Sequence, residues 1–477
     1  MKDTFPMNRA LVAMGLGTLA YALAQTTVLP ALPALASALH TQPQNTTWML
    51  TAYLIAAAVF TPVFSRLGDL FGRRRLLVVV LVVFAAGSVI SALSDDLSVV
   101  LAGRVLQGAG GGVIPLAVGI ARSAFPAERR ARAIGMISAI FGVGSGLGLV
   151  LGGLIVDHTS YTWIFWITAA MAAGSAAAVR LGMPEPEGHS TGGRVDLAGT
   201  ALLGIGVTLP LLAISRGSAW GWASGRTLGL IAVGLLVLVL FGVVERRKAH
   251  PLVDLGLLTR PPVLVTNITT FLVGFGMFGA FVLVPQFAEA PVSTGYGFGA
   301  DATRAGLLLL PGSLAMMAGG PVSAMLYHRY GGRSTLAAAA GVTALGSLLL
   351  AVSHGSQLAV LCWSFVALVG VGVALAVIPT TVVHAVPAAR AAEAAGVNAL
   401  IRSVGSSIGT QVMAGILAGG VALGSPFPHA SAFTSAFLFC AAGALVAAVA
   451  AAFIPRGGPE PVQNSAKTRM AGSARPV

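Results

Sequence analysis

Charged residues are scarce in this chain. Asp, Glu, Lys and Arg make up 9% of its 477 residues, whereas a soluble globular domain carries about 25%. Hydrophobic residues account for 56% and the mean hydropathy is +0.88. This composition excludes an ordinary soluble protein and predicts an integral membrane protein.

Cysteine and clustered polar side chains are also nearly absent. Cys362 and Cys440 lie inside apolar segments, where we expect free packing residues. No His, Cys, Asp and Glu residues show the spacing of a metal site or of a catalytic centre. We therefore expect no enzyme, no cofactor and no metal. No polar stretch is long enough for a soluble domain, which argues against a receptor with an output domain.

Long apolar runs fill most of the chain. A membrane-spanning helix takes about 20 apolar residues, and this length predicts fourteen spans. They are 10–34, 47–65, 76–94, 98–120, 133–156, 163–182, 197–215, 227–244, 263–287, 304–326, 334–353, 357–383, 396–423 and 432–454. The first run is too long for the apolar part of a cleavable signal peptide.

The net charge of +13 is spread unevenly over the loops. With a cytoplasmic N-terminus, the loops on that side hold most of the basic residues: Arg73–Arg75, Arg129, Arg130, Arg132, Arg194, Arg246, Arg247, Lys248, Arg260, Arg329, Arg333 and Arg390. The opposite side holds Arg216, Arg226 and Arg304 and the six tryptophans. Basic loops stay in the cytoplasm and Trp collects at membrane interfaces. We expect a multi-pass protein of the cell (plasma) membrane, both termini cytoplasmic, that binds no nucleic acid.

The segment Ser65–Arg75, Ser-Arg-Leu-Gly-Asp-Leu-Phe-Gly-Arg-Arg-Arg, stands between two apolar runs. Its two glycines permit a tight hairpin between spanning helices. The segment resembles the signature loop between helices 2 and 3 of the major facilitator superfamily, a large group of secondary transporters. The resemblance implies a gating latch formed by Asp69, Arg73 and Arg74.

Leu101–Gly112 is the second motif, and it places Arg104 inside span 4. An intramembrane arginine costs from roughly 3 to well over 10 kcal/mol, so it must face protein or a water-filled cavity. The stretch resembles the family's helix-4 motif at Arg104, Gln107 and Gly108, which implies proton coupling or gating. The alternative is an arginine that snorkels outward or caps carbonyl groups of neighbouring helices.

Span 5 carries glycines at short spacing. Gly144, Gly148, Gly152 and Gly153 resemble the antiporter motif of the superfamily's exporters, with Leu149 in place of the usual proline. Small residues every four positions also let helices approach closely, so ordinary helix packing is the alternative.

Span 1 departs from its relatives. Leu23–Pro33 resembles the helix-1 motif of the fourteen-helix drug:proton antiporters, but Ala24 and Leu29 replace an aspartate and an asparagine. Because a buried carboxylate is the natural proton carrier and cation partner, we expect neutral, zwitterionic or anionic substrates. Asp157 and Glu289 are the nearest candidates for protonation, and solvated helix-end charges are the alternative.

Polar and aromatic residues inside the spans are candidates for a substrate cavity. They are Gln25, Thr26, Tyr53, Asn267, Phe271, Asn398 and Arg402. The alternative is that they form interhelical hydrogen bonds or ordinary apolar packing.

A weak internal repeat supports two similar halves. Ala324–Gly331 echoes the first loop, with His328 where Asp69 stands. The resemblance implies an all-α integral membrane protein with the major facilitator fold, two six-helix bundles plus two extra transmembrane helices. The bundles would be 1–182 and 263–455, the two inserted helices 183–262, and 456–477 a disordered cytoplasmic tail.

The function implied is proton-coupled efflux of small amphipathic organic compounds, such as drugs, antibiotics or secondary metabolites, by alternating access. The expected partners are the substrate, protons and the lipid bilayer, and we expect a monomer. A metabolite uniporter or importer of the same fold, without proton antiport, is the alternative.

Overall fold

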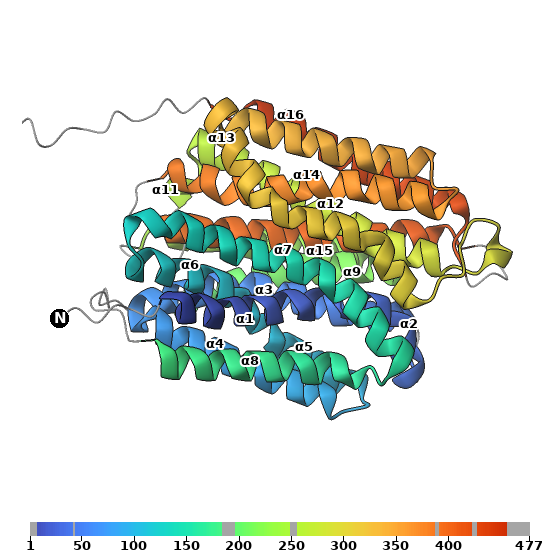
Figure 1. Cartoon of the computed structure of the whole chain (residues 1–477), viewed down its shortest axis with the longest axis horizontal. Helices are drawn as coiled ribbons and strands as arrows, with labels where there is room; N and C mark the ends of the chain where they lie inside the picture. Colours follow the sequence, from blue (N-terminus) through green and yellow to red (C-terminus); the bar gives the residue numbers. More distant parts are fainter. Residues whose placement is uncertain are drawn as a thin grey trace, which may run out of the picture.

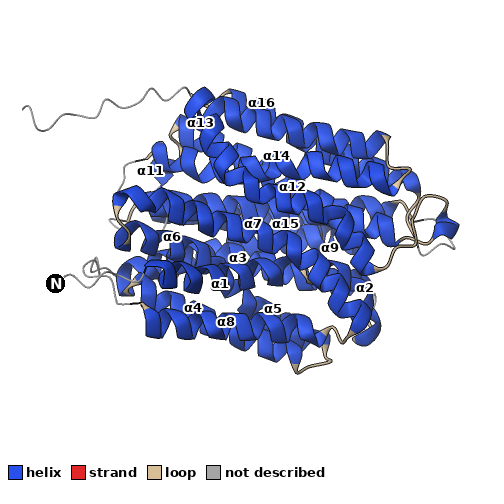
Figure 2. Cartoon of the chain, in the orientation of Figure 1, coloured by secondary structure: helices blue, strands red, loops and turns tan. Residues whose placement is uncertain are grey.

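The computed structural model describes residues 7–41, 43–183, 196–248, 255–386, 391–421 and 427–455. Over these residues the chain is helical, and an isolated bridge between Val421 and Pro428 is the single β-type pairing (Figure 2). The expected tail at 456–477 lies outside the described residues.

The first half of the chain folds into a bundle whose long helices run along one axis (Figure 1). Its helices are α1 (Met7–Thr26), α2 (Val28–Ala38), α3 (Pro43–Phe71), α4 (Arg73–Ala92), α5 (Leu97–Gln107), η1 (Gly108–Gly112), α6 (Val113–Ala124), α7 (Ala127–His158) and α8 (Thr162–Gly182).

Two of the predicted spans in this half are interrupted. Span 1 divides into α1 and α2 at Thr27. Pro30 has no backbone N–H to donate to the preceding turn, and its ring crowds the carbonyl group four residues earlier. Span 4 contains the short 3₁₀ segment η1, where four of five residues are glycine and helix propensity is low. Asp96 begins that span as a cap, accepting hydrogen bonds from the backbone N–H groups of Ser98 (2.7 Å) and Val99 (3.2 Å).

The second half repeats this arrangement after an inserted helical hairpin. The elements are α9 (Leu197–Trp220), α10 (Gly225–Arg246), α11 (Leu255–Leu258), α12 (Pro261–Glu289), η2 (Val292–Thr294), α13 (Ala302–Val352), α14 (Gln357–His384), α15 (Ala391–Gly419) and α16 (Ala430–Ala452).

The internal repeat is visible in the backbone. Helix α13 covers two predicted spans, which are separated at Gly331, where φ is 78°. Gly72, which separates α3 from α4, has φ of 97°. These glycines stand 331 − 72 = 259 positions apart, the same offset as His328 and Asp69. Both turns need a backbone conformation that favours glycine.

Eleven helices of the described residues are long and apolar enough to cross a membrane. Helix α13 counts once among them although it covers two predicted spans, and α9 and α15 are helical over the two that remain. The predicted fold class, an all-α membrane protein with two bundles and two extra helices, is confirmed.

The two halves meet where α3 packs on α15 and α7 packs on α13, and we call these two contacts the seam. Figure 1 shows the N-terminal helices below and the C-terminal helices above, with α7 and α15 between them. The inserted helix α9 joins both halves, since it packs on α3 and on α15, and α10 packs on α9.

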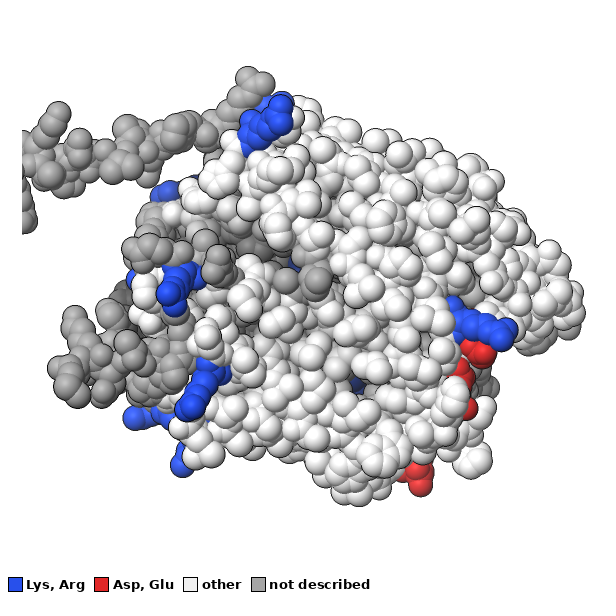
Figure 3. All heavy atoms as spheres, viewed as in Figure 1, with Lys and Arg blue, Asp and Glu red and all other residues white. Residues whose placement is uncertain are grey.

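On the face drawn in Figure 3, charged side chains gather at the two ends of the long axis. Most of the Lys and Arg side chains on this face lie toward one end, Asp and Glu lie at the other beside one basic side chain, and the broad face between the ends is nearly uncharged. We call these the basic end, with Arg73–Arg75 and Arg329, and the acidic end, with Asp95, Asp157 and Asp301. An uncharged band between charged ends is the surface that a bilayer requires.

Candidate functional site

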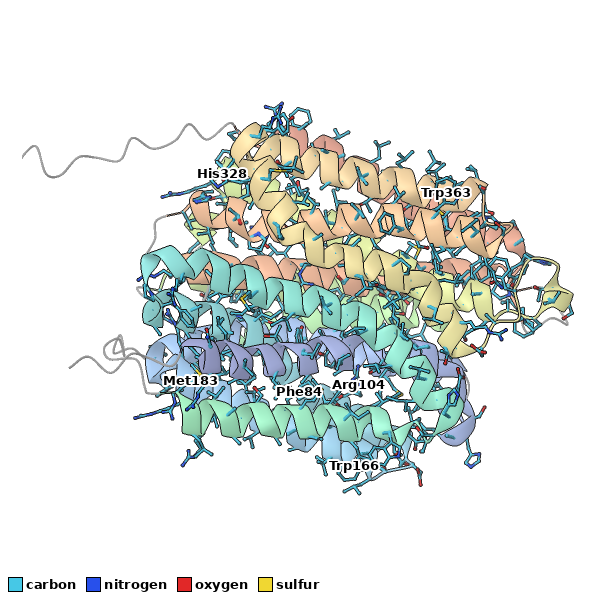
Figure 4. The ribbon with its side chains drawn as sticks, in the orientation of Figure 1. Phe84, Arg104, Trp166, Met183, His328 and Trp363 are labelled. Atoms are coloured by element: carbon cyan, nitrogen blue, oxygen red, sulfur yellow. The ribbon has the colours of Figure 1, made fainter. Side chains whose placement is uncertain are left out.

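Arg104 lies inside the N-terminal bundle with none of its surface exposed (Figure 4). Its Nε donates to the carbonyl oxygen of Met49 (2.9 Å), and its Nη1 donates to the carbonyl oxygen of Ala24 (3.0 Å) and to Oε1 of Gln107 (2.7 Å). The guanidinium carbon stands 4.3 Å from the ring centroid of Tyr53. Arg104 therefore ties α5 to α1 and α3. It does not snorkel outward, and its contacts match the carbonyl-capping alternative.

The two motif residues after Arg104 complete this junction. Gln107 Nε2 donates to Ser88 Oγ of α4 at 2.6 Å, so the polar network reaches a fourth helix. A Cβ at Gly108 would collide with Ala56 and the backbone of Ala57 in α3. Glycine is required there because α3 and the 3₁₀ segment touch backbone to backbone.

An aromatic row leads from Arg104 across the seam. Tyr53 donates its hydroxyl hydrogen to the carbonyl oxygen of Tyr21 (2.9 Å), and the two rings stack with centroids 5.9 Å apart. Tyr21 stacks in turn on Phe141 of α7 at 5.8 Å. The Arg402 guanidinium of α15 lies over the other end of the row, 5.6 Å from the Phe141 centroid. The aromatic row, Tyr53, Tyr21 and Phe141, thus has an arginine at each end.

Sequence reasoning named Tyr53 and both arginines but missed Tyr21 and Phe141. Neither residue falls in a motif. Phe141 stands three positions before Gly144, and helical periodicity does not distinguish it from any other apolar residue of that span.

The remaining cavity candidates fall into two groups. In the C-terminal half, Asn398 Nδ2 donates to Asn267 Oδ1 and to Thr270 Oγ1, both at 2.8 Å, and joins α15 to α12. These bonds fit the alternative to substrate contact, in which the polar residues form hydrogen bonds between helices. The backbone of Phe271 lies against Gly405, so it marks the same helix contact.

In the N-terminal half, Gln25 and Thr26 are buried in α1. Thr26 donates to the carbonyl oxygen of Ala22 in its own helix (3.2 Å), whereas Oε1 of Gln25 has no hydrogen-bond partner in the described part of the chain. The structure therefore does not gather all seven candidates into one cluster.

The glycines of α7 divide between two neighbours. A Cβ added at Gly144, Gly148 or Gly152 would collide with α1 or the residues that follow it. A Cβ at Gly146 or Gly153 would instead collide with α13, at Ser313 and at the backbone of Ala302. One glycine face thus holds α7 in its own bundle, and the other lets it touch the opposite half.

A carboxylate joins the halves at the acidic end. Asp157, near the end of α7, accepts hydrogen bonds through Oδ2 from the backbone N–H (2.9 Å) and the hydroxyl (2.6 Å) of Thr303 in α13. Glu289, at the end of α12, has a buried Oε1 with no hydrogen-bond partner among the described residues. The structure therefore brings both candidate proton sites to the acidic end of the seam.

The basic end holds the predicted latch. Arg73 Nη1 donates to the carbonyl oxygen of Gly119 (2.9 Å), and Arg74 Nε donates to that of Val179 (3.3 Å). These bonds join α4 to α6 and α8. The Asp69 side chain lies outside the described part, so its role as a latch stays a prediction. Figure 4 places His328, its counterpart in the repeat, at the same end, whereas Trp166 and Trp363 lie toward the acidic end.

The inserted hairpin is closed by a charge cluster at the basic end. Lys248 Nζ stands 2.5 Å from Asp196 Oδ2 and 3.1 Å from Glu245 Oε1. Burial alone would raise the pKa of Asp196, but hydrogen bonds with Glu245, Lys248 and the Gly199 amide hold it below its usual value. These contacts fix the ends of α9 and α10 together. No group of three or more His, Cys, Asp or Glu residues within the described ranges could hold a metal.

Comparison with known families matches residues 14–410 to the family described as the Major Facilitator Superfamily. The chain is 30% identical over 333 residues to the multidrug transporter protein MdtP of Bacillus subtilis, covering 69% of this chain and 60% of that protein. It is 32% identical over 409 residues to the multidrug resistance protein Stp of Mycobacterium tuberculosis, covering 84% and 74%. It is 29% identical over 401 residues to the tetracenomycin C resistance and export protein of Streptomyces glaucescens, covering 83% and 73%. The chain thus spans three fifths of the Bacillus protein.

Among solved structures, the chain resembles the human organic anion transporter MFSD10 (TETRAN). The TM-score is 0.63 with 16% sequence identity, over 94% of this chain and 99% of the human one. At that identity the similarity concerns the fold alone.

Proposed function

The chain belongs to the Major Facilitator Superfamily, and on this premise we propose that it exports small amphipathic organic compounds in exchange for protons. Membership makes it a membrane transporter rather than an enzyme. Its relatives include a multidrug transporter and an antibiotic resistance and export protein. Drugs, antibiotics or secondary metabolites are therefore the proposed cargo.

The observation that carries this proposal is the glycine-backed contact of α7 with α13. Alternating access requires that the halves separate at one end and close at the other around a central site. At the acidic end the closure rests on Gly153 against Ala302 and on Asp157 against Thr303, two small contacts that break without unfolding either bundle.

In this proposal, protonation of carboxylates at the acidic end drives the opening of that end. The negative charge on Asp157 strengthens its two hydrogen bonds from Thr303, so adding a proton would weaken closure at the acidic end. Glu289, with its unpartnered buried oxygen, is a second place for a proton close to Asp157 and Asp301. These groups would take the part of the absent span-1 carboxylate.

The arrangement in the membrane follows from charge. We place the basic end in the cytoplasm, since basic segments resist translocation, and the acidic end outside. Helix α1 begins and α16 ends at the basic end (Figure 1), so both termini would be cytoplasmic. We propose the plasma membrane as the location and a monomer as the working unit, because each chain contains a complete seam. Asp69, Arg73 and Arg74 would form the inner latch, and Arg104, Gln107 and Gly108 the junction that couples the proton to the gate.

A uniporter or importer without proton exchange is the second candidate. Ala24 favours it, because an apolar residue replaces the carboxylate that usually carries the proton in the family that this sequence resembles. Counterflow of a transported compound in vesicles at zero proton gradient would favour this candidate.

The experiment for the main proposal uses purified protein in vesicles that hold a pH-sensitive dye. A panel of drugs and antibiotics is added, and compound-triggered proton movement is recorded for wild type, Asp157→Asn and Glu289→Gln. We expect proton movement with at least one compound and a reduction of about tenfold or more in one variant. Transport of a compound with no proton movement in wild type would contradict proton exchange. Asp69→Asn, run in parallel, tests the latch, and unchanged transport would remove Asp69 from the mechanism.

A further inference from the structure

Arg104 and Arg402 both lie inside helices of the described residues, and their surroundings differ. Arg104 has no exposed surface and makes three hydrogen bonds. Arg402, on α15, is half-buried and keeps part of its surface accessible. Its guanidinium lies over the ring face of Phe141 and makes no hydrogen bond or ion pair with another described residue. Arg104 is therefore held by three hydrogen bonds, although its Nη2 has no partner among the described residues, whereas no side-chain hydrogen bond of Arg402 is found there.

An unpaired cation at this depth is costly. A charged side chain inside a bilayer protein costs several kcal/mol unless a partner or water compensates it. No acidic side chain in the described part pairs with Arg402, since the ion pairs found there involve Lys248 and Arg304 at the ends of the molecule. Because part of the Arg402 surface is accessible, water can hydrate the cation, and an anionic ligand can supply its counter-charge.

The position of Arg402 suits a transported ligand. The residue belongs to α15 of the C-terminal half, and Phe141 belongs to α7 of the N-terminal half, so the guanidinium lies on the seam. Tyr21 also lies within electrostatic reach. Phe141 covers one face of the Arg402 guanidinium, and no hydrogen bond to its N–H groups is found among the described residues. The N–H groups of a guanidinium can bind an acidic group through two parallel hydrogen bonds.

We propose that Arg402 binds the acidic group of the transported compound, so that the preferred substrates are organic anions, an aromatic body with a carboxylate, sulfonate or phenolate. The aromatic row offers ring faces beside the guanidinium for such a body. This inference rests on the proposed export function and names its substrate class. Because the anion binds between the halves, its arrival also changes the contact that Arg402 makes across the seam.

Two dyes with one ring system and opposite charge test the proposal: fluorescein, an anion, and rhodamine 123, a cation. Binding to the purified full chain in lipid nanodiscs is followed by fluorescence anisotropy. We expect wild type to bind fluorescein at least about tenfold more tightly than rhodamine 123. Arg402→Gln should lose that preference, and Arg402→Lys should keep part of it. Arg329→Gln, which removes an exposed arginine at the basic end, is the matched control and should keep all of it.

Either of two results would overturn the proposal: equal affinity of wild type for the two dyes, or a preference for fluorescein that survives Arg402→Gln in folded protein. Dye efflux from vesicles under a proton gradient separates this inference from the export function. Arg402-dependent binding of fluorescein without its transport would reject export and keep the anion site. Export of rhodamine 123 without any preference for fluorescein would keep export and reject the anion site.

Discussion

Arg104 of α5 holds α1 and α3 through hydrogen bonds to the carbonyl oxygens of Ala24 and Met49. Replacing it by glutamine shortens the side chain and removes its charged hydrogen bonds to the carbonyl oxygens of Met49 and Ala24, worth about 1.5–3 kcal/mol each. We predict that Arg104→Gln lowers the midpoint of thermal unfolding in detergent by several degrees. Arg402→Gln is the comparison, and because it removes an unpaired charge its midpoint should equal or exceed that of wild type. Arg104→Gln unfolding at the wild-type temperature would contradict the structural role.

At this scale the sequence predicts which residues are unusual but not what they touch. The depth of Arg104 follows from its place in an apolar run, because the cost of an intramembrane charge identifies it. Its acceptors are backbone oxygens of Met49 and Ala24, and every residue carries such an oxygen, so no residue type indicates them. The aromatic row was not predicted either, because Tyr21 and Phe141 occupy apolar positions that no motif distinguishes from their neighbours.

Helix α7 is the element on which the two halves meet and part. A side chain at Gly153 would enter the backbone of Ala302 and hold α13 away at the acidic end. We predict that Gly153→Leu increases labelling of a cysteine at Ala302 by an impermeant thiol reagent, by about threefold or more, because a few kcal/mol of overlap shifts a closed seam open. Cys362 is exposed and is first replaced by serine.

Gly135→Leu is the matched control on the same helix, because no atom lies within 4 Å of a Cβ placed there. Its labelling should equal that of the parent. Equal labelling of the Gly153 and Gly135 variants would show that the glycine face of α7 does not govern closure.

The elements themselves were largely predictable. The lengths of the apolar runs predict the spans, and each predicted span is helical in the structure. The repeat around Asp69 and His328 predicts the corresponding turns at Gly72 and Gly331. The breaks at Thr27 and at η1 were not anticipated, because a hydropathy window averages over one proline or a short glycine run. The division of the α7 glycines between two neighbours also depends on tertiary packing, which spacing alone leaves open.

At the scale of the whole molecule, we propose that the two halves rock about the seam and expose the proposed substrate site at Arg402 to one end at a time. Helix α9 of the inserted hairpin packs on both α3 and α15, so it must remain bound to both while they move. The charge distribution predicts which end faces the cytoplasm. The rocking of the two halves is tested by the distances between them.

Distances between spin labels measure it most directly, with one pair at the acidic end (Leu154 and Leu307) and one at the basic end (Phe71 and Ser334), all exposed positions in the structure. Labels are attached to cysteines in a Cys362→Ser background, in nanodiscs, with and without fluorescein and at two pH values. The account predicts changes of opposite sign, one end opening by several ångströms as the other closes. Distances that stay constant, or that lengthen together at both ends, would contradict it.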